Sequence, residues 1–265
     1  PIGLPKGTTI SMRYIYDNSA GNPRNPHRPP VRVVWGQNTS NEMGDLWIQV
    51  IPRSAADAST LHADFRRKAL AEDLAAYTKL LRSDQANPLR HDAVAALYLE
   101  DGRFDEAIAA YRQSLRLNNE SAPTHYNLGY ALSAAGSRVE AIAQFQEAIR
   151  IDPDYAQAHN NLGALLQLAG QPDPALAHYQ RAVVLRPDNV EARANFGQLL
   201  SIQGRVAEAV DQFREALALK ADYPQALAGL AWVRATAFDP AFRNAEEGVR
   251  LAEQADGATG HRSVL

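Results

Sequence analysis

The sequence of 265 residues contains no cysteine, which excludes disulfide bonds, thiolate zinc sites and a cysteine nucleophile. It also lacks any apolar run of about 18 residues, so it predicts no membrane-spanning helix. Strong charge is absent as well: the net charge of −3 argues against a nucleic-acid-binding surface over the whole chain. Hydrophobic residues make up 46% of the chain and charged residues 22%, which is typical of a globular protein.

Residues 1–53 differ in composition from the rest. They hold seven of the fifteen prolines, and six Lys or Arg against three Asp or Glu. Apolar and polar residues alternate from Ile10 to Tyr16 and predict a half-buried strand, and Val31–Trp35 and Leu46–Ile51 predict two more. Three strands bury too little apolar surface to be stable alone. We therefore expect this segment to be the end of a larger β domain that begins before Pro1.

From Ala55 onward the sequence is alanine-rich and helical in pattern. A first helix is expected from Ser59 to Arg82, within a connecting segment, residues 54–87. Beyond Pro88, five columns of similar residues recur at a spacing of 34. The columns are Gly102, Gly136, Gly170 and Gly204; Ala107, Ala141, Ala175 and Ala209; Tyr111, Phe145, Tyr179 and Phe213; Ile108, Ile142, Leu176 and Val210; and Ser114, Ala148, Ala182 and Ala216. This register predicts units of two helices around a Gly-containing turn, with small residues where helices approach closely.

The pattern resembles the tetratricopeptide repeat (TPR) family. Its first-helix signature stands as Asn127-Leu128-Gly129, Asn161-Leu162-Gly163 and Asn195-Phe196-Gly197, and the second helices carry the Ala and aromatic columns. The resemblance implies a mainly α fold, an α-solenoid over residues 88–257, after a β segment left from a β-sandwich (jelly-roll) domain and before a tail, 258–265. The predicted units are 88–121, 122–155, 156–189, 190–223 and a partial fifth, 224–257.

The fifth unit departs from the pattern because its turn is longer. We expect a turn about two residues longer, after which Ala245, Val249 and Ala252 recover the spacing of the repeated columns. No polar capping helix follows before Leu265, so we expect the repeat array to continue beyond this residue.

The stacked first helices of such an array are expected to line a concave groove that binds a partner protein or peptide segment. Asn127, Asn161 and Asn195 recur at one position there, and such a ladder of amides can hydrogen-bond an extended peptide backbone. The alternative is that each Asn supports the turn of its own repeat. Further candidates for partner binding near this ladder are Tyr126, Tyr130, Asn160, Gln167 and Gln198. Basic residues that would clamp a terminal carboxylate are missing from these positions.

Three histidines, His91, His125 and His159, are also spaced by 34 residues. Equivalent atoms of successive repeats are separated by about a helix-pair width, roughly 10 Å. A zinc or copper ion needs nitrogen ligands at about 2 Å, so one ion cannot bridge two of these side chains. We expect them to pack between helices.

The N-terminal segment carries a second resemblance, to the end of the catalytic region in bacterial relatives of the copper type II, ascorbate-dependent monooxygenases. The motifs are Leu4–Thr8, Tyr16–Ser19, Asn22–Pro26, Trp35–Thr39 and Glu42–Asp45. In that family a Glu-Met motif supplies a thioether ligand to copper, which implies Met43 as a ligand candidate; a soft sulfur suits Cu(I). The alternative is that Met43 packs in a core. The family also needs a His-x-His pair, and this sequence contains none.

Two functions therefore follow. The first is a protein–protein interaction scaffold that binds a partner segment in the groove of the repeats, without a cofactor and without nucleic acid. The alternative is the C-terminal part of a copper-dependent monooxygenase, an oxidoreductase whose His-x-His ligands precede Pro1 and whose relatives commonly work outside the cytoplasm. The chain alone is not expected to be an enzyme, because one thioether cannot hold copper.

Overall fold

The computed structural model of the chain describes residues 10–12, 48–50 and 55–259. The chain divides into two compact units, Pro1–Asp73 and Leu74–Leu265. In the described part of the first unit, β1 (Ile10–Met12) pairs antiparallel with β2 (Ile48–Val50). Both strands lie inside segments that alternation predicts as strands.

Helix α1 (Ala55–Ser83) follows β2 and contains the boundary between the two units. It begins four residues before the helix predicted from Ser59. Its C-terminal end is held within the second unit by Arg90, whose guanidinium donates to the Leu80 carbonyl and, at 3.1 Å, to the Ser83 hydroxyl. No helix in the described residues is long and apolar enough to cross a membrane.

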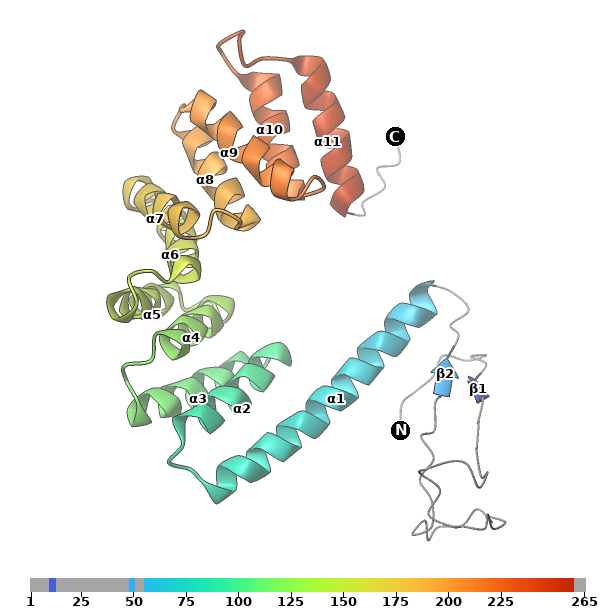
Figure 1. The fold of residues 1–265 in the computed structure, drawn as a ribbon, viewed down its shortest axis with the longest axis vertical. Helices are drawn as coiled ribbons and strands as arrows, with labels where there is room; N and C mark the ends of the chain where they lie inside the picture. The colour runs from blue at the N-terminus through green and yellow to red at the C-terminus, as the bar shows by residue number, and fades with distance from the viewer. Residues whose placement is uncertain (1–9, 13–47, 51–54, 260–265) are drawn as a thin grey trace, which may run out of the picture. The chain divides into compact units, whose positions relative to one another are not determined.

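Residues 88–259 fold into ten helices that form five consecutive pairs (Figure 1). We number the pairs as repeats 1 to 5 and call their members the first and second helix. The pairs are α2 (Pro88–Glu100) with α3 (Phe104–Leu117), α4 (Ala122–Ala134) with α5 (Arg138–Ile151), α6 (Ala156–Leu168) with α7 (Pro172–Leu185), α8 (Val190–Ile202) with α9 (Val206–Leu219), and α10 (Pro224–Thr236) with α11 (Ala245–Thr259).

Each second helix packs against its own first helix, and α3, α5, α7 and α9 also pack against the first helix of the following repeat. First helices contact one another as well, α2 with α4, α6 with α8 and α8 with α10. The exposed side chains of α2, α4, α6, α8 and α10 therefore form one surface that continues from repeat to repeat. We call it the first-helix surface.

The glycines of the first column end the first helices of repeats 1 to 4. Gly102 and Gly136 have φ of +73° and +82°, a left-handed conformation that strains any residue with a Cβ. Helix starts are also set by sequence. Asn87 and Asn189 cap α2 and α8, each accepting a backbone N–H at 3.0 Å. These local signals explain why the helix ends follow the 34-residue period.

The alanine and aromatic columns of the second helices are buried in the core. Tyr179 is 2% exposed, and a Cβ added to Gly163 of the same repeat would lie 2.9 Å from its ring. Glycine in the Asn-Leu-Gly signature therefore lets the first helix lie directly on the aromatic ring of the second. Gly129 and Gly197 face Phe145 and Phe213 in the same way.

Repeat 5 differs from the prediction. Eight residues, 237–244, join α10 to α11, where three residues, 203–205, join α8 to α9, so the insertion is five residues and not two. The prediction for Val249 is therefore wrong, because its side chain is 60% exposed, and Ala245 and Ala252 are exposed too. The inward face of α11 consists of Gly248, Leu251 and Ala255. A small residue is needed at Gly248, where a Cβ would lie 3.2 Å from the Ala231 carbonyl oxygen.

Candidate functional site

Amide side chains connect neighbouring repeats on the first-helix surface. Asn161 Nδ2 donates to the Tyr126 hydroxyl at 3.3 Å, and Asn195 Nδ2 donates to Asn160 Oδ1 at 3.1 Å. Asn160 in turn donates to Glu191 Oε1 at 3.1 Å. Two of the three ladder asparagines thus brace adjacent first helices, a contact that the sequence did not predict.

The remaining predicted residues divide into two groups. Asn127 has no hydrogen-bond partner within the described residues, and Tyr130 is 50% exposed. Gln198 is exposed on α8. Gln167, in contrast, is partly buried and accepts a hydrogen bond from the Tyr179 hydroxyl at 3.1 Å, which ties it to the second helix of its own repeat. Asn127, Tyr130 and Gln198 are therefore the predicted residues with side chains available to a partner.

Tyr126 is held by an aromatic cluster at the boundary of repeats 2 and 3. Its ring centroid lies 5.0 Å from that of Tyr155 and 5.7 Å from that of Phe145. Burial, and to a lesser degree the neighbouring Tyr155, raises the pKa of Tyr126 above its usual value of 10.0. The hydroxyl therefore stays protonated at neutral pH and can donate to a partner while it accepts from Asn161.

Charged residues are few on the first helices of repeats 2 to 5. Helices α4, α6, α8 and α10 contain Glu191, Arg193 and Arg234 and no other Asp, Glu, Lys or Arg. Arg193 is bound to Glu215 and to the Pro187 carbonyl at 2.7 Å. Arg234 Nε lies 3.0 Å from a carboxylate oxygen of Glu247. Glu191 has only the Asn160 amide as a partner in the described part of the chain, so its negative charge is not neutralised there.

The periodic histidines have a structural role. Nε2 of His91, His125 and His159 lies 2.9, 3.1 and 3.1 Å from the carbonyl oxygen six residues earlier. Arg193 occupies the same column in repeat 4 and donates to its equivalent carbonyl, that of Pro187. Each side chain ties the start of a first helix to the preceding loop. In the residues that the structure describes, no group of three or more His, Cys, Asp or Glu is placed to hold a metal ion.

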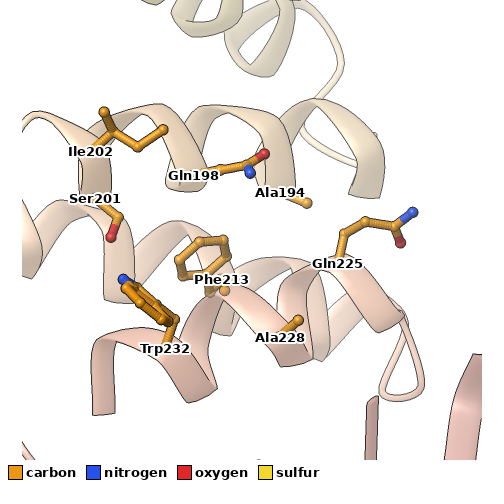
Figure 2. Close-up of a pocket in the computed structure, with 9 residues that line it drawn as sticks. Ala194, Gln198, Ser201, Ile202, Phe213, Gln225, Ala228 and Trp232 are labelled. Atoms are coloured by element: carbon orange, nitrogen blue, oxygen red, sulfur yellow. The ribbon is translucent and has the colours of Figure 1, made fainter. Parts of the chain in front are cut away.

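A pocket opens in the first-helix surface between α8 and α10, with a volume of about 420 Å³ (Figure 2). Phe213 of α9 lies between the two helices. Of the binding residues predicted from the sequence, only Gln198 lines this pocket. The lining residues are Ala194, Gln198, Ser201, Ile202, Phe213, Gln225, Ala228, Gly229 and Trp232.

Family models match the helix pairs of repeats 1 to 4. One described as TPR repeat matches residues 95–136 and 139–170, and two described as tetratricopeptide repeat match 156–189 and 190–221. These helix pairs are tetratricopeptide repeats. The predicted α-solenoid is thereby confirmed, and the TPR fold supports a role as a protein–protein interaction scaffold. Among curated proteins, none matches the chain.

Solved TPR structures are similar to the array. YrrB, described as a TPR protein with an unusual peptide-binding site, is 25% identical over 70% of this chain and 93% of its own, with a TM-score of 0.57. MamA is 27% identical over 65% of this chain and 100% of its own, with a TM-score of 0.54. PilF of Pseudomonas aeruginosa, at 16% identity, covers 75% of this chain and 88% of its own with a TM-score of 0.65, which shows the shared fold alone.

The copper monooxygenase resemblance gains no support from these comparisons. The matched family models begin at residue 95. Met43, the ligand candidate, and the predicted strand Val31–Trp35 lie outside the described residues. A copper site in the N-terminal segment stays a prediction.

Proposed function

We propose that the TPR array binds an extended segment of a partner protein along the first-helix surface. The proposal rests on polar and aromatic side chains of this surface that are exposed or lack a hydrogen-bond partner within the described residues. Asn127 has no partner within the described residues, and Tyr130 and Gln198 are exposed. Amides can pair with a peptide backbone, and tyrosine combines apolar contact area with a hydroxyl.

The internal bracing supports the same proposal. The hydrogen bonds from Asn161 to Tyr126 and from Asn195 to Asn160 fix the spacing between first helices before a partner arrives. A surface that is already ordered loses less entropy when it binds, which favours affinity. The peptide-binding site described for YrrB, a similar TPR structure, is consistent with this use of the fold.

The charge of the surface favours a protein partner over a nucleic acid. Nucleic-acid affinity depends on Lys and Arg that neutralise phosphates. On α4, α6, α8 and α10 the two arginines are bound to carboxylates of their own repeats, and Glu191 adds a negative charge. A phosphate backbone would be repelled here, whereas a neutral or basic peptide would not.

The proposal is tested by selecting phage-displayed random dodecapeptides on the full chain and measuring the affinity of enriched peptides by fluorescence anisotropy. Asn127→Ala should weaken binding about threefold to tenfold, the value of one or two lost hydrogen bonds. Gln180→Ala is the matched control, because Gln180 is an exposed amide on the second helix α7. Failure to enrich any peptide, or equal losses in both variants, would contradict the proposal.

A further inference from the structure

The pocket between repeats 4 and 5 exists because two columns change residue type there. At the boundary of repeats 2 and 3 these columns hold Tyr126 and Asn161, which are hydrogen-bonded to each other. At the next boundary they hold Asn160 and Asn195. At the boundary of repeats 4 and 5 the same positions are Ala194 and Gly229. Replacing two long polar side chains by a methyl group and a hydrogen leaves an open space on the first-helix surface.

The inner wall of this space is aromatic. Phe213 is 1% exposed, and a Cβ added to Gly229 would collide with its ring. Gly229 therefore allows the Phe213 ring to reach the pocket at a position where repeats 2 to 4 carry an asparagine. A ligand entering the pocket meets the ring and not a hydrogen-bonded pair of side chains like those at the two preceding boundaries.

The rim is apolar and unpartnered. Trp232 on α10 is 67% exposed and Ile202 on α8 is 68% exposed, and both line the pocket (Figure 2). Covering such side chains with an apolar group removes their surface from water and is favourable. The volume of about 420 Å³ falls within the range of pockets that hold small ligands, so one large side chain and its flanking backbone fit.

Polar groups frame the two ends of the pocket. Gln198, Ser201 and Gln225 line it and offer neutral donors and acceptors to a peptide backbone. Glu191 lies one helical turn before Ala194 on α8, and its charge contributes, after burial, to raising the pKa of Tyr223 next to α10. No Lys or Arg neutralises Glu191 in the described residues. The complement of this arrangement is an apolar side chain next to a positive charge.

We propose that this pocket binds one aromatic or branched apolar side chain of a partner protein segment, and that a Lys or Arg of the same segment pairs with Glu191. The proposal rests on the function proposed above and specifies which sequence the array prefers. The occupant is a segment of another protein, because the neutral amides around the pocket suit a peptide backbone and the carboxylate of Glu191 selects a cation.

The test repeats the selection of random dodecapeptides with the full chain and with Ala228→Tyr. Ala228 is exposed and lines the pocket, and its column holds Tyr126 in repeat 2, so a tyrosine can fill the space without strain in the helix. Peptides enriched on the unchanged chain should share an aromatic or branched apolar residue within a few positions of Lys or Arg. Their anisotropy-measured affinity should fall about tenfold or more in Ala228→Tyr.

Two further variants separate the parts of the proposal. Trp232→Ala should also lower the affinity for the enriched peptides. The fold should stay intact, because this substitution only shortens an exposed side chain. Glu191→Gln should reduce binding of peptides with Lys or Arg about twofold to fivefold and leave their Lys→Gln versions unaffected. Ala177→Tyr is the matched control, because Ala177 is an exposed alanine on the second helix α7 and lies outside the first-helix surface.

The outcomes distinguish this inference from the proposed function. If the unchanged chain enriches no peptide, both fail. If peptides are enriched but bind Ala228→Tyr and Trp232→Ala as tightly as Ala177→Tyr, the array binds segments and the pocket is not the recognition site. If the enriched peptides share no apolar residue, the pocket is likewise not the recognition site. If they are enriched in Asp or Glu instead of Lys or Arg, the proposed pairing with Glu191 is wrong.

Discussion

Nδ1 of His159 on α6 lies 2.9 Å from Nδ1 of His178 on α7, so one imidazole donates a hydrogen bond to the other. Nε2 of His159 lies 3.1 Å from the Pro153 carbonyl, which can only accept. The Nδ1 of His159 is therefore the acceptor and His178 the donor when both rings are neutral. Burial lowers the pKa of both histidines below 6.5, and the charge of His159 lowers that of His178 further.

This pair makes stability depend on pH. A histidine with a lowered pKa in the folded state binds more protons when unfolded, so its contribution is complete above pH about 6.5 and is lost as the pH falls toward the folded value. We expect the Tm to fall between pH 7.5 and 5, and to fall less in His178→Gln. The previous repeat provides the precedent, because His125 Nδ1 lies 2.7 Å from Gln144 Oε1. Thermal melts followed by circular dichroism check this; parallel pH curves for the two proteins would contradict it.

The signature glycines pack closely, so adding one methyl group to a signature glycine should lower the free energy of unfolding. Gly163→Ala places a Cβ 2.9 Å from two atoms of the Tyr179 ring, and we expect a loss of about 1–3 kcal/mol in the free energy of unfolding. Gly257→Ala on α11 is the matched control, since a Cβ there meets nothing within 4 Å. It should be neutral or stabilise by about 0.5–1 kcal/mol, as alanine does in a helix. Urea unfolding measures both, and similar values would show that the ring moves freely.

Equivalent asparagines should contribute differently to the free energy of unfolding, because only some of them brace a neighbouring helix. Asn195→Ala removes the donor to Asn160, and we expect the free energy of unfolding to fall by about 1 kcal/mol. Asn127→Ala removes no hydrogen bond within the described residues and should change stability by less than about 0.5 kcal/mol. Chemical denaturation of the two variants side by side checks the contrast. An equal loss would mean that Asn127 has a structural partner.

The attachment of the last helix depends on one buried ion pair. The Arg234 side chain is 9% exposed and pairs with Glu247 of α11, while it also donates to the Phe242 carbonyl at 2.9 Å. Glu247→Ala leaves this charge without its carboxylate, and we expect a loss of about 3 kcal/mol and rapid proteolysis of α11. Arg150→Ala, which removes a 54% exposed side chain from two surface pairs, should cost less than about 1 kcal/mol. Comparable protease resistance in both variants would refute the role of Arg234.

Several parts of the fold were predictable from residues alone. The columns containing Gly136, Ala141 and Phe145 define a turn, a close contact and a core position in that order, and the structure has each of them. The reason is that a helical repeat uses local signals: a left-handed glycine, a capping side chain and a 3.6-residue period act within a few positions. The packing role of His91, His125 and His159 was predicted differently, from the distance between successive repeats, which is too long for two of them to share one metal ion.

The sequence failed where a local signal was missing or where distant residues meet. The loop before α11 has no repeated glycine, so Val249 was placed in the core although it is exposed. Asn160, a predicted binding residue, is 3% exposed and hydrogen-bonded to Asn195 and Glu191, contacts that arise only when the helices stack. Ala194 and Gly229 are the positions where two columns lose their polar side chains. This change indicates a pocket only when the stacking of the helices is known.

The sequence by itself therefore determined the repeat unit, its helices and its core, because these depend on interactions between residues close together in the chain. Only the tertiary structure decided which of the repeated side chains remain available. Asn127 and Asn161 are equivalent by sequence, yet Asn161 is bound to Tyr126 and Asn127 is not bound to any described residue. Tyr126 precedes Asn161 by 35 residues and faces it only after the helices stack, so this hydrogen bond belongs to the tertiary structure.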